Sequence, residues 1–180
     1  MEKDNLRKGS LKKYIAYVLY MAVAKNLPSS GNSARGLFEK IRAICLRGYI
    51  DKCGHDVNIQ PKAIVARRVW LDDYSGIGES SLVQGNVHIG KHVMMGPEVY
   101  IYTQNHRFDQ LDITMDSQGF GEEKSVVIED DVWIGSRVTI LPGVTVGTGS
   151  VIGASSVVTK DIPPYSIACG NPAKIVKLRK

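Results

Sequence analysis

The sequence predicts a mainly β protein in which short parallel strands wind into about five triangular coils. Two observations predict this fold: apolar residues recur at every sixth position, and small or β-branched residues recur with the same period, four positions after each of them. The first block of the apolar repeat contains Cys53, Ile59, Val65, Leu71, Ile77, Val83, Ile89, Met95 and Ile101. The second block contains Ile128, Ile134, Ile140, Val146, Ile152 and Val158.

The period of six excludes the simpler regular structures. A surface helix needs apolar residues three and four positions apart, and an amphipathic strand needs strict alternation. Short strands joined by tight turns fit the period, because glycine permits a sharp change of direction where Gly135, Gly147 and Gly153 follow repeat positions. Three such strands close one coil, so the fifteen repeats predict about five coils. Such a prism would be about 25 Å tall at roughly 4.8 Å per strand.

The composition limits the class of protein. A chain of 180 residues with 43% hydrophobic and 23% charged residues is typical of one soluble globular unit. The formal charge of +5 permits nucleic acid, an acidic membrane surface or a polyphosphate ligand as partner. No nucleic-acid-binding motif is present, so we expect no nucleic acid partner. The odd number of cysteines without metal-ligand spacing and the lack of a secretory signal predict a cytoplasmic protein without a metal.

Residues 1–52 are expected to form an N-terminal helical segment. A first helix is predicted over residues 10–26, capped by Ser10 and ended before Pro28, with apolar residues at helical spacing at Leu11, Ile15, Val18, Leu19 and Ala22. Its apolar run is too short to span a bilayer. Two interpretations are open: peripheral contact of this basic helix with the acidic inner face of the cell membrane, or packing against the coils or a neighbouring subunit.

A second helix is predicted over residues 34–52, joined to the first through residues 31–33. The pattern predicts that one set of side chains faces inward and another is solvated. The inward set is Leu37, Ile41, Ile44 and Cys45, and the solvated set is Arg35, Arg42 and Arg47. The expected role of this helix is to cover the open end of the coils, where unpaired strand groups would otherwise promote aggregation.

A loop interrupts the coils within the second segment, residues 53–180. Ile101 and Ile128 are 27 positions apart, which is not a multiple of six. The interruption covers residues 103–125, and a long irregular loop inside a regular solenoid is usually either functional or disordered. It carries His106 near its beginning, so this loop is the candidate functional segment.

Over residues 53–180 the repeat, with an Ile or Val often followed by Gly and then by Val or Ser, resembles the hexapeptide-repeat acyltransferase family. The resemblance implies a left-handed parallel β-helix, whereas the usual preference for right-handed parallel crossovers would give the opposite hand. It also implies acetyl-CoA as co-substrate and a homotrimer. The active sites would lie between neighbouring subunits, with the loop reaching across.

The segment Gln104-Asn105-His106-Arg107 resembles the catalytic histidine segment of this family. Acetyl transfer from a thioester to a hydroxyl needs a base within hydrogen-bond reach of that hydroxyl, and histidine suits this proton transfer. We therefore predict His106 as the general base, with Asn105 beside it in the acceptor site. His88 lies one coil of eighteen residues earlier and would stack beneath His106 in an uninterrupted prism, either lining the acceptor pocket or standing as a solvated corner histidine.

The same resemblance implies the residues that bind the coenzyme. Trp133, Gly135 and Ser136 would lie along its pantetheine arm, with Ala154, Thr159 and Lys160 further along. Lys160 and Lys174 would meet its phosphates as point charges. A backbone amide at a glycine turn would stabilise the oxyanion, and the sequence does not single out which one.

The sequence departs from the galactoside and maltose acetyltransferase pattern. Those relatives have Pro after the histidine and Asn-Phe-Asn further upstream, where this chain has Arg107 and residues 75–78, Ser-Gly-Ile-Gly. The basic helical segment and the stretch that begins at Met94 are more similar to capsular or surface-polysaccharide O-acetyltransferases. The predicted function is O-acetylation of a sugar hydroxyl in such a polysaccharide or its precursor. Xenobiotic (antibiotic) or small-sugar acetylation is the alternative, and a non-catalytic scaffold is the alternative of another class.

Overall fold

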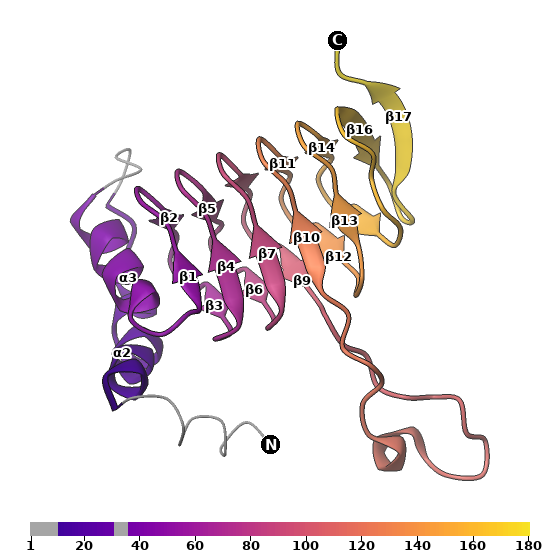
Figure 1. Ribbon diagram of the computed structural model, residues 1–180, viewed down its shortest axis with the longest axis horizontal. Coiled ribbons are helices and arrows are strands. Elements are labelled where there is room, and N and C mark those ends of the chain that lie inside the picture. The colour runs from indigo at the N-terminus through magenta and orange to yellow at the C-terminus, as the bar shows by residue number, and fades with distance from the viewer. Residues whose placement is uncertain (1–10, 31–35) are drawn as a thin grey trace.

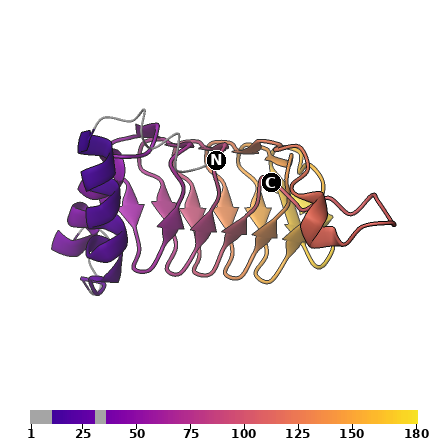
Figure 2. The same ribbon diagram turned by 90° about the horizontal axis from the view of Figure 1, so that it is seen from below.

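The computed structural model describes residues 11–30 and 36–180 and has the form of a triangular prism with a helical cap at one end (Figures 1 and 2). A long loop leaves the side of the prism, and the C-terminal strands lie at the end opposite the cap. The predicted cap residue Ser10, the predicted link 31–33 and the predicted start of the second helix at residue 34 lie outside the described residues. The first strand begins at Lys52.

Two α-helices form the cap. They are α2 (Leu11–Ala22) and α3 (Leu37–Arg47), and the short 3-10 helix η1 (Ala24–Asn26) follows α2. A second 3-10 helix, η2 (Met115–Gln118), lies in the protruding loop. No helix in the described part of the chain is long and apolar enough to cross a membrane.

The strands are two to five residues long and form three faces, which we name A, B and C in chain order. Face A contains β1 (Lys52–Cys53), β4 (Val69–Leu71), β7 (Val87–Ile89), β10 (Val126–Ile128) and β13 (Thr145–Val146). Face B contains β2 (Asn58–Ile59), β5 (Gly76–Ile77), β8 (Met94–Met95), β11 (Trp133–Ile134), β14 (Val151–Ile152), β16 (Ser166–Cys169) and the antiparallel β17 (Lys174–Leu178). Face C contains β3 (Ile64–Val65), β6 (Leu82–Val83), β9 (Tyr100–Ile101), β12 (Thr139–Ile140) and β15 (Val157–Val158).

Each coil pairs in parallel with the next coil, at a step of eighteen residues where nothing interrupts the repeat, as Ile59 with Ile77 and Val65 with Val83. Across the loop the step is longer, and Val87 pairs with Val126. Strands β1 to β15 make five complete coils, and the bridge of Ile162 to Val146 together with β16 begins a sixth. The prediction of about five parallel coils is therefore confirmed.

The predicted repeat positions form the core. The apolar residues at every sixth position are buried except Cys53 and Met95, which are half-buried. The residues four positions later are buried as well, except in the loop, where Asn105 is exposed. Where that second position is serine, the hydroxyl bonds to the neighbouring coil. Ser75 Oγ donates to the Gly90 carbonyl at 2.6 Å and accepts from the Val93 amide at 3.0 Å. Small polar residues can therefore be buried at the corners without an unpaired group.

The helical cap supplies hydrogen-bond donors to the first coil. Arg42 Nε donates to the Ile59 carbonyl at 2.6 Å, and the hydroxyls of Tyr20 and Tyr49 donate to the Ala63 and Val65 carbonyls at 2.9 and 3.0 Å. The first coil has no coil before it, so these buried carbonyls would otherwise lack partners. The prediction that a helix covers the open end of the coils is thus confirmed.

The predicted orientation of α3 is wrong in part. Ile41 and Cys45 pack against the core and Arg47 is exposed, as predicted, while Arg35 lies outside the described residues. Arg42, expected to be solvated, is completely buried, whereas Leu37 and Ile44, expected to face inward, are 68% and 65% exposed. The reason is that the end of the prism needs donors, and a guanidinium supplies several of them where an aliphatic side chain supplies none. Arg42 also donates to the Leu27 carbonyl at 3.0 Å.

Arg42 is paired with Glu39, which is also buried, at 2.8 Å. Burial alone would raise the pKa of the Glu39 carboxyl, but hydrogen bonds with Ser30 and the charge of Arg42 outweigh it and hold that pKa below its usual range. The carboxylate therefore stays charged and the pair stays intact at neutral pH.

We predict that Arg42→Ala lowers the free energy of unfolding by about 3–5 kcal/mol, because it leaves a buried carboxylate and several carbonyls without partners. Urea unfolding followed by circular dichroism measures this. Lys40→Ala on the exposed side of the same helix is the matched control, and a similar loss for both variants would contradict the role assigned to Arg42.

Candidate functional site

The loop of residues 103–125 leaves the prism at the edge between faces C and A, between β9 and β10. Its two ends form an antiparallel stem in which the Gly121 amide donates to the Asn105 carbonyl at 2.9 Å and the Arg107 amide donates to the Gly119 carbonyl at 3.0 Å. His106 lies in this stem and bridges to Phe120. The stem and loop extend away from the body of the prism (Figures 1 and 2).

The His106 side chain is exposed, and its ring lies against the ring of Phe120 with centroids 4.3 Å apart. The stem fixes the backbone on both sides of the histidine, and the phenyl ring limits the directions in which the imidazole can turn. Asn105 is also exposed. An accessible imidazole on a fixed stem can accept a proton from a bound ligand.

Four of the predicted coenzyme-binding residues lie together on another part of the prism. Trp133 is on β11 of face B and its side chain is 52% exposed. Gly135 and Ser136 follow it at the edge between faces B and C, and Ala154 lies at the same edge one coil further on. A Cβ atom on Gly135 would lie 2.6 Å from the Ala154 amide nitrogen, so glycine is required for the coils to stack here.

The edge between faces B and C carries backbone donors. The Gly135 amide donates to the Ile152 carbonyl at 2.8 Å. The Ser136 and Ala154 amides, by contrast, donate to no acceptor within residues 11–30 and 36–180. Two unpaired amides, one coil apart on the same edge, can bind carbonyl or anionic groups of an elongated ligand.

Two of the remaining predicted coenzyme residues lie elsewhere: Thr159 and Lys160 follow β15 at the edge between faces C and A, the edge from which the loop departs. Lys174 begins β17 and pairs with Cys169, which stands against Gly153, so it lies near the edge that carries Ala154. On a single chain the predicted set is therefore divided between two edges, which are separated by the width of face C.

The phase of the repeat could have shown this division. His106 and Lys160 follow repeat positions of face C, Ile101 and Val158, whereas Gly135 follows Ile134 and Ala154 comes after Ile152, both of face B. Three six-residue repeats make one coil, so consecutive repeats lie on consecutive faces, and the repeat to which a residue belongs gives its face. The prediction of the repeat from its period did not include this assignment of faces.

Face C itself is largely apolar on its outer side. Its strands present Ile64, Leu82, Tyr100, Thr139 and Val157 outward; Ile64 is 42% exposed and the others are half-buried. A flat apolar face between two edges that carry candidate functional groups is a surface suited to another copy of the chain.

The expectation that His88 would stack beneath His106 is wrong. The loop takes His106 out of the prism, and the residue that pairs with His88 in the next coil is Val127. In the coil below, the His88 ring stacks on the ring of Trp70, with centroids 4.2 Å apart and planes 8° from parallel. Trp70, exactly one coil before His88 in sequence, was not singled out by the sequence analysis.

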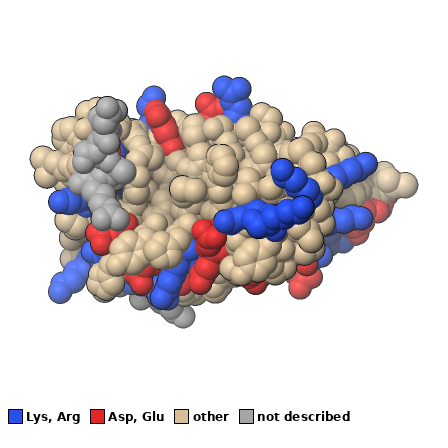
Figure 3. Space-filling model, turned by 90° about the horizontal axis from the view of Figure 1, so that it is seen from above, with Lys and Arg blue, Asp and Glu red and all other residues tan. Residues whose placement is uncertain are grey.

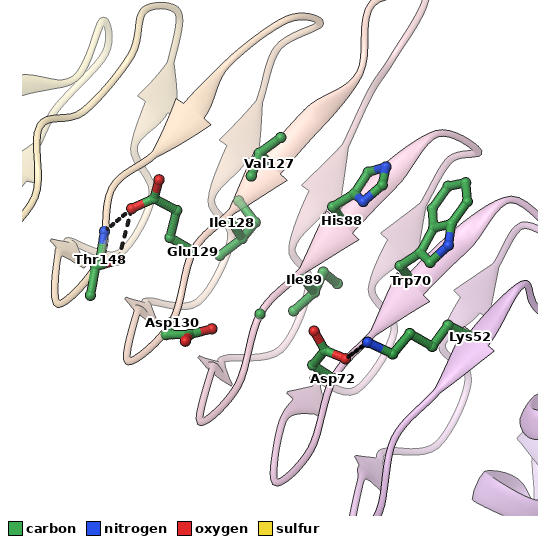
Figure 4. A pocket seen from close by; sticks show the side chains of 11 residues that line it. Lys52, Trp70, Asp72, His88, Ile89, Val127, Ile128, Glu129, Asp130 and Thr148 are labelled. Carbon is green, nitrogen blue, oxygen red and sulfur yellow. Dashed lines mark hydrogen bonds and ion pairs between the residues drawn. The ribbon is translucent and has the colours of Figure 1, made fainter.

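Trp70 and His88 line a groove of about 400 Å³ on face A (Figure 4). The other side chains around it include a Lys52–Asp72 ion pair and Glu129, which accepts hydrogen bonds from the Thr148 amide and hydroxyl at 2.7 Å. The groove borders β10, the strand that begins directly after the loop. Aromatic rings beside carboxylates and a hydroxyl offer both apolar and hydrogen-bonding contacts to a polyhydroxylated ligand.

Basic side chains gather near the C-terminal end of the molecule. Strand β17 and the residues after it carry the exposed side chains of Lys174, Lys177, Arg179 and Lys180. Figure 3 shows Lys and Arg side chains along the part of the molecule where β17 lies. Within the described residues no group of three or more His, Cys, Asp and Glu side chains is arranged to hold a metal ion.

Comparison with known families and sequences identifies relatives. Residues 125–160 match the family described as bacterial transferase hexapeptide (six repeats). A putative acetyltransferase from Schizosaccharomyces pombe is 48% identical over 91 residues, which are 51% of this chain and 42% of that protein. This chain spans about half the length of the curated relatives it matches.

Two solved structures extend the similarity to nearly the whole chain. A hexapeptide-repeat-containing acetyltransferase from Vibrio cholerae O1 biovar eltor, complexed with acetyl coenzyme A, is 30% identical. The match covers 94% of this chain and 87% of that one, with a TM-score of 0.65. A galactoside acetyltransferase in complex with coenzyme A is 25% identical, with a TM-score of 0.77 and coverage of 94% and 81%.

Proposed function

The chain belongs to the bacterial transferase hexapeptide family, and from this premise we propose that it is an acetyl-CoA-dependent O-acetyltransferase that acts on a sugar hydroxyl. The observation that carries the proposal is the accessible His106 imidazole on the stem of the loop that interrupts the prism. A sugar hydroxyl is a weak nucleophile at neutral pH and needs a base held in position.

The proposed reaction is a direct transfer. The His106 imidazole accepts the proton of the sugar hydroxyl while the hydroxyl oxygen bonds to the thioester carbonyl carbon. The carbon–sulfur bond then breaks, and the imidazolium returns the proton to the departing coenzyme thiolate. The products are an acetylated sugar and free coenzyme A, so each turnover releases one thiol.

The edge between faces B and C supports binding of the coenzyme's pantetheine arm. Trp133 offers an exposed indole, and the unpaired amides of Ser136 and Ala154 offer donors to the amide carbonyls of the arm or to the developing oxyanion. We assign the phosphates of the coenzyme to Lys160 and Lys174, each a flexible point charge.

We further propose that each active site forms between two copies of the chain in a homotrimer. A base must come within about 3 Å of the reacting hydroxyl, but a face of six residues can span about 20 Å at about 3.3 Å per residue. His106 lies beyond one edge of face C and Ser136 lies at the other edge. If the loop of one copy lies over the next copy's edge between faces B and C, both sets meet and the apolar face C is covered.

For the acceptor we propose a surface polysaccharide or its precursor. The groove on face A supports a long acceptor, because it reaches β10, the strand that follows the loop, and combines the Trp70 and His88 rings with several carboxylates. A free monosaccharide bound at His106 would have no need of this groove.

We propose that the protein works in the cytoplasm, where acetyl-CoA is the acetyl donor. The three cysteines, Cys45, Cys53 and Cys169, are unpaired in the described residues, which suits a reducing compartment.

We predict that His106→Ala lowers kcat by roughly 10²- to 10⁴-fold while binding of coenzyme A is unchanged, because only proton transfer is lost. Release of free thiol in a screen of oligosaccharide acceptors measures the rate, and calorimetry measures coenzyme binding. His92→Ala, at a histidine that stacks on Tyr74 outside the loop, is the matched control.

Two outcomes would contradict the proposed function. One is a His106→Ala variant as active as the His92→Ala control. The other is a wild-type protein that neither binds coenzyme A nor releases thiol with any sugar acceptor, which is the result expected of a non-catalytic scaffold.

We also predict that Trp70→Ala raises KM for long oligosaccharide acceptors by about 2- to 10-fold, the value of one aromatic contact, and leaves KM for a monosaccharide acceptor unchanged. The control is Tyr74→Ala, which removes an exposed stacked ring that does not line the groove. An equal effect on short and long acceptors would show that the groove on face A is not part of the acceptor site.

A further inference from the structure

Apart from Lys12 and Lys13, helix α2 consists of apolar residues, but the protein covers only one side of it. On the covered side Tyr20 is completely buried, and its ring and that of Tyr17 lie 5.5 and 5.4 Å from the ring of Tyr49. On the uncovered side the exposed fractions are 73% for Leu11, 49% for Tyr14, 48% for Ile15, 40% for Val18, 50% for Leu19 and 55% for the following Val23. A surface helix normally carries polar residues on its uncovered side.

The exposed residues form a continuous stripe and not a scatter. Leu11, Ile15, Val18 and Ala22 are spaced four, three and four residues apart, which puts them on one side of the helix. Leu37 and Ile44, at 68% and 65% exposure, add apolar surface on the adjoining helix α3. Contiguous apolar surface of this kind marks a place where another apolar phase or molecule binds.

The charges around the stripe indicate what covers it. Helix α2 contains Lys12 and Lys13 and no acidic residue, and Lys25 follows it in η1. In the sequence no Asp or Glu occurs between Asn5 and Phe38. Lys12 is exposed at the border of the stripe, whereas Lys13 lies in the row of Tyr17 and Tyr20 on the covered side. An exposed apolar stripe with a bordering lysine and no acidic residue nearby is complementary to the acyl chains and anionic headgroups of a lipid bilayer.

A second copy of the chain is a poorer match for this surface. Two copies that met through α2 would bring their lysines together, and like charges at an interface oppose association. The length of α2 also suits a bilayer surface: at about 1.5 Å per residue its 12 residues are about 18 Å long, well short of the roughly 30 Å of a hydrocarbon core.

We propose that α2 binds the protein to an anionic lipid bilayer, lying in the plane of the membrane surface with Leu11, Ile15, Val18 and Leu19 toward the acyl chains. The exposed Lys12, which borders the stripe, then meets the headgroups. The membrane proposal does not depend on catalysis. Either this proposal or the proposed function can therefore fail while the other holds.

The test is sedimentation of the full-length protein with vesicles of phosphatidylcholine alone or mixed with phosphatidylglycerol. We expect binding to the mixed vesicles, weakened by salt because the lysine contribution is screened, and little binding to phosphatidylcholine alone. Lys12→Gln should lower the partition coefficient about fivefold, the effect of one charge.

The apolar contribution has its own variant and control. Ile15→Glu combined with Val18→Glu should abolish sedimentation with the mixed vesicles, whereas Val176→Glu, at a 62% exposed position on β17, should not. Ile15, Val18 and Val176 are all exposed. The circular dichroism spectra and the rates of thiol release of these variants should therefore remain as in the wild type.

Two results would overturn the proposal: no binding of the wild type to the mixed vesicles, or binding that Ile15→Glu with Val18→Glu leaves intact. Light scattering identifies the alternative occupant. If, without lipid, the assembly formed by the Ile15→Glu and Val18→Glu variant is smaller than the wild-type assembly, then a second copy covers α2 and the membrane proposal is wrong.

Discussion

The hydrogen-bond ladder between successive coils is the constraint on which the rest of the structure depends. Each coil satisfies its backbone groups by pairing with the coils next to it, at a step of eighteen residues except across the loop. The same step stacks the inward Ile and Val side chains into a single core. A ladder of this kind has two open ends, and here buried Arg42 with two tyrosines closes the first, while antiparallel β17 pairs alongside the last.

The ladder also explains why the candidate site is divided. A residue's face follows from its place in the count of eighteen, so groups that follow face C and groups that follow face B project from different edges of one prism. The loop can interrupt the repeat only between two strands, and it does so between β9 and β10. A histidine carried by this loop therefore projects from a different edge than Ser136 on the same chain. The proposed assembly with a second copy brings the two residues together.

The core and the coils could be predicted from the sequence because every sixth residue is buried and is therefore apolar. The loop was predictable for the same reason, since it breaks the count between Ile101 and Ile128. The hand of the coil came from the family resemblance alone. The orientation of α3 was not predictable from periodicity, because Arg42 is buried to satisfy carbonyls of the first coil, which lie in another segment. The Trp70–His88 stack was also missed, because it is a contact across coils between outward side chains.

In the proposed homotrimer the base comes from one copy and the coenzyme arm lies on another. A crystal structure with coenzyme A bound would show whether this is so. We expect the coenzyme sulfur within hydrogen-bond reach, about 3–4 Å, of the His106 imidazole of one copy, with the pantetheine arm along Trp133 and Ser136 of a neighbour. A coenzyme held entirely by one copy, or with its sulfur distant from every His106, would contradict this arrangement.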